Sequence, residues 1–159
     1  MLSVRNLLVA AAALGAAACA TYPSYPPGPP PIYGAMQINV ATKAPFGPYL
    51  VDGAGRAVYM LEGTRGTPAE RCSGECLRVW PPLHVNARPV AGPGVDPARL
   101  STIRAHGHNH VYYSGWTLFY YHRDRGPGDT TGQHVTDRWG TWHLVAPSGQ
   151  PIRPVGSGY

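Results

Sequence analysis

The amino-acid sequence predicts an all-β domain of antiparallel strands over residues 36–154. Apolar and polar residues alternate there in short runs bounded by Gly, Pro, Asp and Ser, which is the pattern of strands joined by tight turns. Within this range we find no run with the spacing of an amphipathic helix. Two glycine turns, Asp52-Gly53-Ala54-Gly55 and Ser114-Gly115, mark places where strands fold back on one another.

The expected strands follow from these runs in chain order. The turn at residues 52–55 joins the second strand to the third. Ser114-Gly115 joins two aromatic-rich strands as a two-residue hairpin, because glycine readily adopts the positive φ that this turn needs. The strands are Gln37–Ala41, Pro48–Asp52, Arg56–Leu61, Leu100–Ala105, His110–Ser114, Trp116–His122 and Thr141–Ala146.

The two hairpins resemble one another. Residues 51–59 precede the similar residues 111–119 by sixty positions, and each hairpin leads into a loop rich in Gly and Pro. Each loop then ends at a tryptophan followed by apolar residues, Trp80-Pro81-Pro82-Leu83 and Trp142-His143-Leu144-Val145. This pattern predicts a tandem duplication in which two related units share one core.

The first eighteen residues form a separate segment. Arg5 and the amino terminus supply positive charge, and the apolar run 7–18 that follows is too short to span a bilayer, which needs about 20 apolar residues. A short apolar run that ends in small residues is typical of a signal peptide. We therefore expect residues 1–18 to be removed on export.

Cys19 is the expected start of the exported protein. Ala16-Ala17-Ala18-Cys19 looks like a lipobox, after which a lipoprotein signal peptidase cuts so that Cys19 carries lipid. The alternative is an ordinary cleavage site with an incidental cysteine beyond it. Ala20 and Thr21 lack the Asp that commonly retains lipoproteins in the inner membrane. In a cell with two membranes we therefore predict the outer one.

Residues 19–35 are expected to be a tether. The stretch 20–33 holds six prolines, three tyrosines and no charge, which favours an extended polyproline II spacer. The alternative is a proline-rich ligand for a partner domain. At the other end, residues 155–159 are expected to be a flexible tail.

Two further properties narrow the function. If Cys19 carries lipid, Cys72 and Cys76 remain as a pair, and outside the cytoplasm such a pair predicts a disulfide that staples a loop. A redox-active pair and a zinc site are the alternatives. The net charge is +5, but the basic residues are scattered without a run or stripe, so we expect no nucleic-acid partner.

At this point two sets of residues resemble a known group. The first set is Tyr49-Leu50-Val51-Asp52, Gly55, Val58-Tyr59, Cys72, Gly74, Cys76 and Trp80-Pro81-Pro82-Leu83. The second is Val111, Tyr113, Gly115, Leu118-Phe119-Tyr120-Tyr121, Asp124, Pro127-Gly128-Asp129, Gly132-Gln133, Trp142 and Leu144-Val145. Over about residues 46–149 the chain resembles bacterial predicted lipoproteins of the family called the secreted repeat of unknown function, which carry a Tyr-x-aromatic-x-x-Asp motif.

The resemblance implies an all-β repeat domain outside the cytoplasm and no assigned activity. The second unit matches the motif through Phe119, Tyr121 and Asp124, with Phe119 in place of Tyr. The first unit reads Tyr59-Met60-Leu61-Glu62-Gly63-Thr64, so the second aromatic residue and the Asp are missing there. If the motif carries function, we expect the second unit alone to carry it.

The segment His106-Gly107-His108-Asn109-His110 is the strongest candidate for metal chemistry. Residues at i, i+2 and i+4 of a strand share one face, and three imidazoles there could bind Cu or Zn. Gly107 indicates a nearby turn, so the alternative is a polar exposed turn. His84, His122, His134 and His143 could join only if the fold brings them close.

The remaining candidates are Asp124, Asp129 and the aromatic residues. Asp124 and Asp129 flank Arg125-Gly126-Pro127-Gly128, where they could act as ligands or as acid/base groups, or could cap a turn through backbone N–H groups. The aromatic residues among 112–121 could pack across strands or form a binding face. No catalytic motif is legible, so an enzyme is not expected.

Together these observations predict an envelope lipoprotein that is not an enzyme. A membrane holds it through the lipid on Cys19, and it binds or scaffolds an envelope ligand or protein whose identity the sequence does not reveal. One alternative is a Cu- or Zn-binding protein that uses His106, His108 and His110. The other is an envelope redox protein or enzyme that acts near Asp124 or through Cys72 and Cys76.

Overall fold

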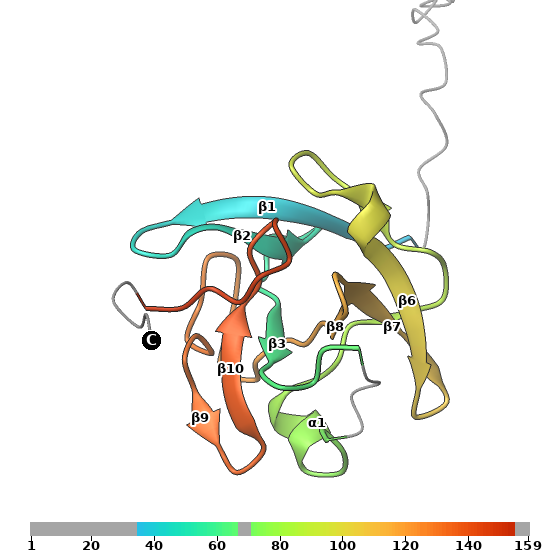
Figure 1. Ribbon diagram of the computed structural model, residues 1–159, viewed down its shortest axis with the longest axis vertical. Helices are drawn as coiled ribbons and strands as arrows, with labels where there is room; N and C mark the ends of the chain where they lie inside the picture. Colours follow the sequence, from blue (N-terminus) through green and yellow to red (C-terminus); the bar gives the residue numbers. More distant parts are fainter. Residues whose placement is uncertain (1–34, 67–70, 155–159) are drawn as a thin grey trace, which may run out of the picture. The chain divides into compact units, whose positions relative to one another are not determined.

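The computed structural model describes residues 35–66 and 71–154. The predicted signal peptide, Cys19, nearly all of the tether and the tail at 155–159 lie outside the described residues. No helix within the described part is long and apolar enough to cross a membrane. The described chain is built from short strands in three sheets, which confirms the all-β prediction (Figure 1).

The first sheet has the order β2-β1-β5. Strand β1 (Gln37–Lys43) pairs with β2 (Gly47–Asp52) in antiparallel fashion, and Ile38 lies opposite Asp52. The short strand β5 (Val90–Ala91) lies parallel to β1 on its other side. Figure 1 shows this sheet across the top of the domain.

The second sheet contains the hairpins of the histidine- and aromatic-rich segment. Strand β7 (His108–Tyr113) pairs with β6 (Leu100–Ala105), with β4 (His84–Val85) and with β8 (Trp116–Thr117). Ser114 and Gly115 have φ of 51° and 94°, as the predicted two-residue turn requires. The expected strand 116–122 is shorter than predicted, since β8 ends at Thr117.

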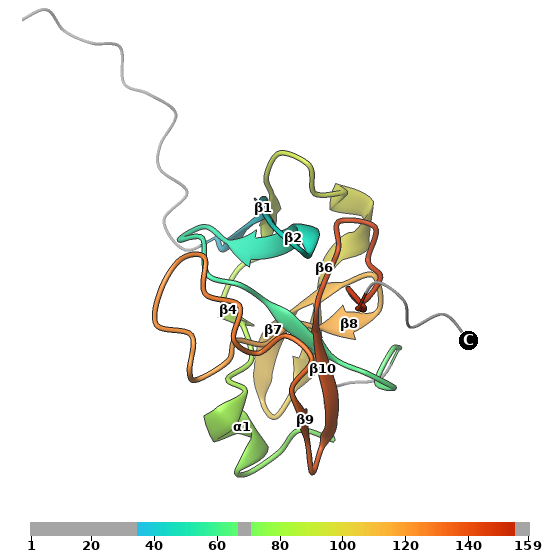
Figure 2. The ribbon, with the colours of Figure 1, turned by 90° about the vertical axis from the view of Figure 1, so that its left-hand side faces the viewer.

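The third sheet has the order β3-β10-β9, from β3 (Tyr59–Leu61), β10 (Gly140–Leu144) and β9 (Thr136–Asp137). Two short helical turns, which the sequence pattern did not predict, complete the described elements: α1 (Cys76–Val79) and the 3₁₀ turn η1 (Pro97–Arg99). Figure 2 shows β10 beside β9, with β1 and β2 above them.

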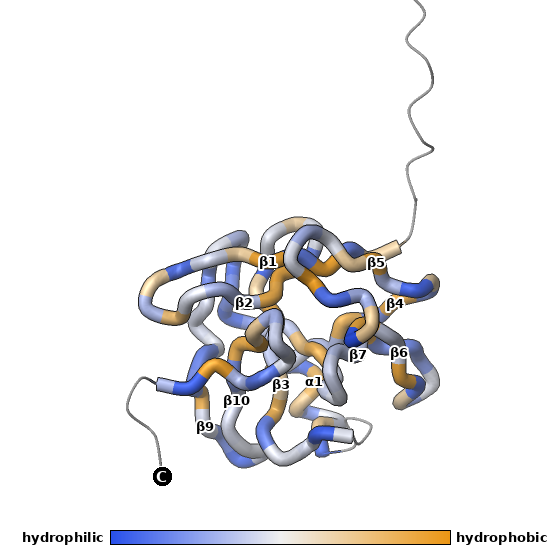
Figure 3. The backbone as a smooth tube through the Cα atoms, turned by 45° about the horizontal axis from the view of Figure 1, so that its top comes forward, coloured by the Kyte–Doolittle hydropathy of each residue, from blue (hydrophilic) through white to orange (hydrophobic). Residues whose placement is uncertain are grey.

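The core has an aliphatic part and an aromatic part. Buried and mainly aliphatic residues from β1 to β4, from β6 to β8 and from adjoining loops form the aliphatic cluster. The aromatic cluster gathers around Trp80 and Trp142, which are fully buried and stack with ring centroids 4.0 Å apart. Hydrophilic residues lie mainly in the connecting loops at the periphery (Figure 3).

The two similar segments exchange partners across this core. Tyr59 and Phe119 donate backbone N–H groups to each other's carbonyl oxygens at 2.8 and 2.9 Å. Tyr59 of β3 pairs with Leu144 of the second closing strand, and Phe119 pairs with Pro82 of the first. Each hairpin therefore contacts the tryptophan segment of the other. The duplication itself stays a prediction.

Candidate functional site

The motif residues of the second unit lie at the edge of the aromatic core. Phe119 and Tyr121 are buried, with 1% and 7% of their surface exposed, and Tyr121 stacks on Trp80 at 4.2 Å. The Asp124 carboxylate follows them in the loop. It accepts hydrogen bonds from the Tyr59 hydroxyl at 2.6 Å and from the Thr131 amide and hydroxyl at 2.9 and 2.6 Å.

Burial raises the pKa of Tyr59 well above its usual value, and the bond to Asp124 raises it further. The Tyr59 hydroxyl therefore keeps its proton and remains the donor to Asp124. Gly132 completes this packing, since a Cβ there would lie 2.9 Å from the Tyr59 ring and 3.0 Å from the Trp80 ring. Asp124 thus ties its own loop to a tyrosine of the other unit.

Asp129 holds the same loop from the other side. Its carboxylate accepts hydrogen bonds from the backbone N–H groups of Arg125 and Gly126, at 2.8 and 3.2 Å. This is the turn-capping role that the sequence offered as one alternative.

A cleft of about 230 Å³ opens beside the motif residues. We call it the motif cleft. Its lining includes Arg56, Pro81, Tyr120, Tyr121, His122 and Asp124. Residues of both units therefore form its walls.

One wall of the motif cleft is cationic and aromatic. The Arg56 guanidinium lies over the Tyr120 ring, 4.2 Å from its centroid. It also pairs with the buried Asp52 carboxylate at 2.7 Å, yet half of the Arg56 side chain is exposed. Tyr120 donates its hydroxyl proton to the same carboxylate at 2.8 Å.

These contacts determine the charge of Asp52. Burial pushes the pKa of Asp52 up, but hydrogen bonds from the Arg56 amide and the Tyr120 hydroxyl, with the Arg56 charge, lower it below its usual value. The pKa of Tyr120 is raised, first by burial and then by its bond to Asp52. Asp52 therefore stays ionised and fixes the arginine against the tyrosine.

The cysteine pair forms the predicted disulfide. Cys72 and Cys76 are bonded to one another, and both are fully buried in the aromatic cluster. The bridge closes the loop that leads into α1. Burial of both sulfur atoms supports the role of a loop staple.

The histidine segment does not lie along one strand. His106 and Gly107 form the turn between β6 and β7, with φ of 49° and 80°. His108 and His110 lie on one face of β7, and His84 of β4 is the residue paired with His110. The His84 ring lies 4.9 Å from that of His108 and 4.7 Å from that of His110, whereas His106 is 6.4 Å from His110.

The three neighbouring imidazoles differ in burial. His110 is fully buried, whereas His84 and His108 are exposed. Burial, followed by the neighbouring imidazoles, lowers the pKa of His110 and also that of His84. As placed, no three His, Cys, Asp or Glu side chains of the described residues form a metal-binding group.

Residues 101–146 match the family described as a secreted repeat of unknown function. This match confirms the predicted resemblance over these residues. The match spans β6 to β10 and contains Phe119, Tyr121 and Asp124. No curated protein and no solved structure matches the chain. A secreted family is compatible with an exported protein, and it supports a location outside the cytoplasm.

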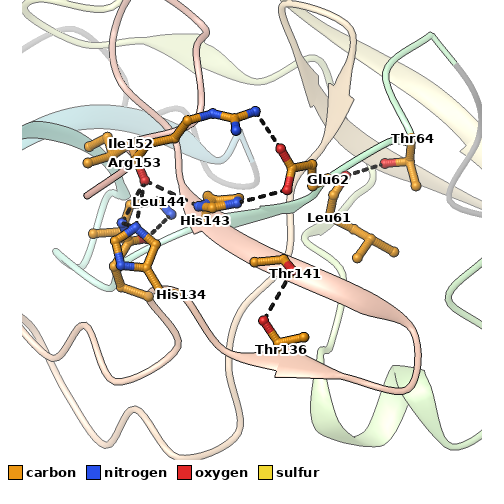
Figure 4. A network of polar contacts seen from close by, with 11 residues as sticks. Leu61, Glu62, Thr64, His134, Thr136, Thr141, His143, Leu144, Ile152 and Arg153 are labelled. Atoms are coloured by element: carbon orange, nitrogen blue, oxygen red, sulfur yellow. Dashed lines mark hydrogen bonds and ion pairs between the residues drawn. The ribbon is translucent and has the colours of Figure 1, made fainter. Parts of the chain in front are cut away.

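The described domain also carries a polar network that the sequence did not predict (Figure 4). His143 of β10 is buried and its Nε2 atom lies 3.4 Å from Glu62, which also pairs with Arg153. The Ile152 carbonyl oxygen lies 3.2 Å from His143 Nδ1 and 3.1 Å from His134 Nε2. This network joins β10 to residues on both sides of the matched range.

Two important residues had no local sequence signal. Asp137 of β9 accepts hydrogen bonds from the indole N–H groups of both Trp80 and Trp142, at 2.9 and 3.1 Å. His84 joins the histidine cluster only because β4 pairs with β7. The contacts of Asp137 with Trp80 and of His84 with His110 join residues far apart in the chain, so only the fold could reveal them.

Proposed function

We propose that the protein is a lipid-anchored binding module of the cell envelope, that it is not an enzyme, and that its ligand site is the motif cleft. Lipid on Cys19 would hold it to a membrane, which we propose to be the outer membrane in a cell with two. The secreted family and the predicted signal peptide support export.

The bonding of Asp124 carries this proposal. An acid or base that acts on a substrate must reach it with a free lone pair or proton. Both carboxylate oxygens of Asp124 are instead occupied by Tyr59 and Thr131. The motif therefore supplies a fixed wall, which suits binding better than proton transfer.

The chemistry of the cleft suggests what it binds. The half-exposed guanidinium of Arg56 faces a lining of tyrosine rings, with the exposed His122 at the rim. Arginine favours carboxylate and phosphate groups, and aromatic rings favour sugar or other flat apolar surfaces. We propose an envelope ligand that combines an anionic group with such a surface.

Photo-crosslinking in intact cells tests the binding site. A photoreactive residue replaces the exposed His122 at the rim, and a control chain carries it at the exposed Thr102 of β6, outside the cleft. We expect a defined adduct from position 122 that is absent from position 102, and Arg56→Gln should reduce it. Equal labelling at both positions, or an adduct that Arg56→Gln leaves unchanged, would contradict a cleft-bound ligand.

The anchor is tested separately by metabolic labelling with an alkyne-bearing palmitate. The wild-type chain should incorporate label and sediment with membranes, in the outer-membrane fraction where there is one. Cys19→Ala should lose both properties, whereas Cys72→Ala with Cys76→Ala should keep the label. A labelled Cys19→Ala chain would contradict the anchor without affecting the cleft.

A further inference from the structure

The histidine cluster at the pairing of β4 with β7 contains a buried nitrogen without a partner. His110 is fully buried, and its Nδ1 atom has no hydrogen-bond partner among the described residues. A buried polar atom that lacks a partner is unfavourable by about 1–3 kcal/mol. Such an atom therefore needs an explanation.

The hydrogen bond of His110 Nε2 shows whether Nδ1 carries a proton. His110 Nε2 lies 2.9 Å from the backbone carbonyl oxygen of Ala105. A carbonyl oxygen can only accept, so Nε2 carries the proton of the neutral ring. Nδ1 is therefore an unprotonated nitrogen with a free lone pair. Metal-binding histidines commonly have this arrangement, in which the second ring nitrogen donates to a carbonyl group.

Two further imidazoles lie close to the His110 ring. His84 faces it across the strand pair at 4.7 Å between ring centroids, and His108 lies 4.9 Å from His84. Both side chains are exposed, so their χ angles can change without repacking the core. His110, by contrast, is held by the sheet and by Ala105.

We propose that His84, His108 and His110 bind one Cu(II) or Zn(II) ion, with His110 Nδ1 as the fixed ligand and the two exposed rings turning towards it. Neutral imidazole suits both ions, and three protein nitrogens leave a position open for water or a donated ligand. The ligand set differs from the one predicted from the sequence, because His106 lies in the turn and His84 takes its place.

Calorimetry on the untagged mature chain, titrated with Zn(II) or Cu(II), tests the stoichiometry and the ligands. We expect one ion per chain. His84→Gln and His108→Gln should each weaken metal binding by about 10- to 100-fold or more, because loss of a group that only orients a metal ligand already has an effect of this size. His106→Gln is the matched control, since it removes an exposed imidazole from the same hairpin, and it should leave the affinity unchanged.

Two spectroscopic readouts do not depend on a variant that folds. Electron paramagnetic resonance of the Cu(II) form of the wild-type chain should show coupling to imidazole nitrogens. Nitrogen-15 NMR of the metal-free chain should show His110 as the Nε2–H tautomer, with its Nδ1 resonance moving when Zn(II) is added. Binding that is absent or only millimolar, equal losses in His106→Gln, or an Nδ1–H tautomer at His110 would each overturn the proposal.

Discussion

Each hairpin is followed by a connection that leads to its tryptophan segment. The two connections are held in place by different kinds of bond. In the first connection, a disulfide between Cys72 and Cys76 closes the loop before α1. In the second, which runs from residue 122 to 139, carboxylates take the place of the covalent bond. Asp124 and Asp129 tie the loop by hydrogen bonds to its backbone.

The difference shows where the domain concentrates its polar support. Asp137 of the second connection binds the indole N–H groups of both Trp80 and Trp142, and Asp124 reaches Tyr59 of the first unit. The disulfide of the first connection closes only its own loop, whereas the carboxylates of the second connection reach residues of both units. The family match at residues 101–146 covers this second connection.

The largest expected effect comes from removing either tryptophan. Trp80 and Trp142 are equally buried and stack on each other, so Trp80→Ala and Trp142→Ala should each lower the free energy of unfolding by about 3–5 kcal/mol. Urea unfolding measures both. The double variant should show a coupling energy of about 0.5–3 kcal/mol. Strictly additive losses would argue against a shared core.

Asp137 should be the most important carboxylate of the second connection. Asp137→Ala leaves two indole N–H groups without their acceptor, and we expect a loss of about 2–3 kcal/mol. Asp129→Ala is the control in the same connection, because Asp129 bonds only to loop amides, and its loss should be about 1 kcal/mol. Equal values for the two variants would contradict the role assigned to Asp137.

Loss of the disulfide should have a moderate effect. The closed loop is short, and the chain-entropy relation gives about 2 kcal/mol for the bridge. Cys72→Ala with Cys76→Ala should therefore remain folded at room temperature and unfold at lower urea concentration. The motif cleft lies in the part that carboxylates support, so crosslinking from position 122 should persist. An unfolded double variant would show that the disulfide supports both units as well.

The smallest expected effect is a pH dependence of stability that comes from the second tryptophan segment and not from the first. His143 of β10 titrates, whereas the matching residue of the first segment, Pro81, does not. Burial lowers the pKa of His143, although the nearby Glu62 opposes this. The unfolded chain, with a histidine pKa of about 6.5, then binds the proton more readily, so stability should fall as the pH drops below about 6.5.

Unfolding at about pH 7.5 and about pH 5.5 should reveal this difference, because the two values bracket the ordinary histidine pKa. His143→Gln should reduce it. His134→Gln is the control, since His134 contacts the same Ile152 carbonyl oxygen at a less buried position. An unchanged pH dependence in His143→Gln would contradict the assignment.

Much of the fold could be read from local patterns. Strands β1, β2, β6 and β7 and the Ser114-Gly115 turn follow from alternation and from glycine at the turn. The expected strand 116–122 does not form a regular ladder beyond Thr117. Its partner contains Pro81 and Pro82, which lack N–H donors, so only an isolated bridge forms between Pro82 and Phe119. The matching strand β10 has its amides and pairs regularly with β3.

The candidate sites were less predictable, because their residues meet only through long-range contacts. Asp137 lies 57 positions from Trp80, and His84 reaches His110 across a strand pair. The sequence identified Asp124 through its motif but could not show that Tyr59 of the other unit occupies its carboxylate.

Native-state hydrogen exchange on Asp124→Ala tests most directly whether the family motif braces a core shared by both units. Removing the carboxylate frees the Tyr59 hydroxyl and the Thr131 amide at once. We expect lowered protection in β3 of the first unit and in β10 of the second, by similar amounts, as well as in the loop itself. Loss of protection confined to residues 122–132, with β3 and β10 unchanged, would contradict this account.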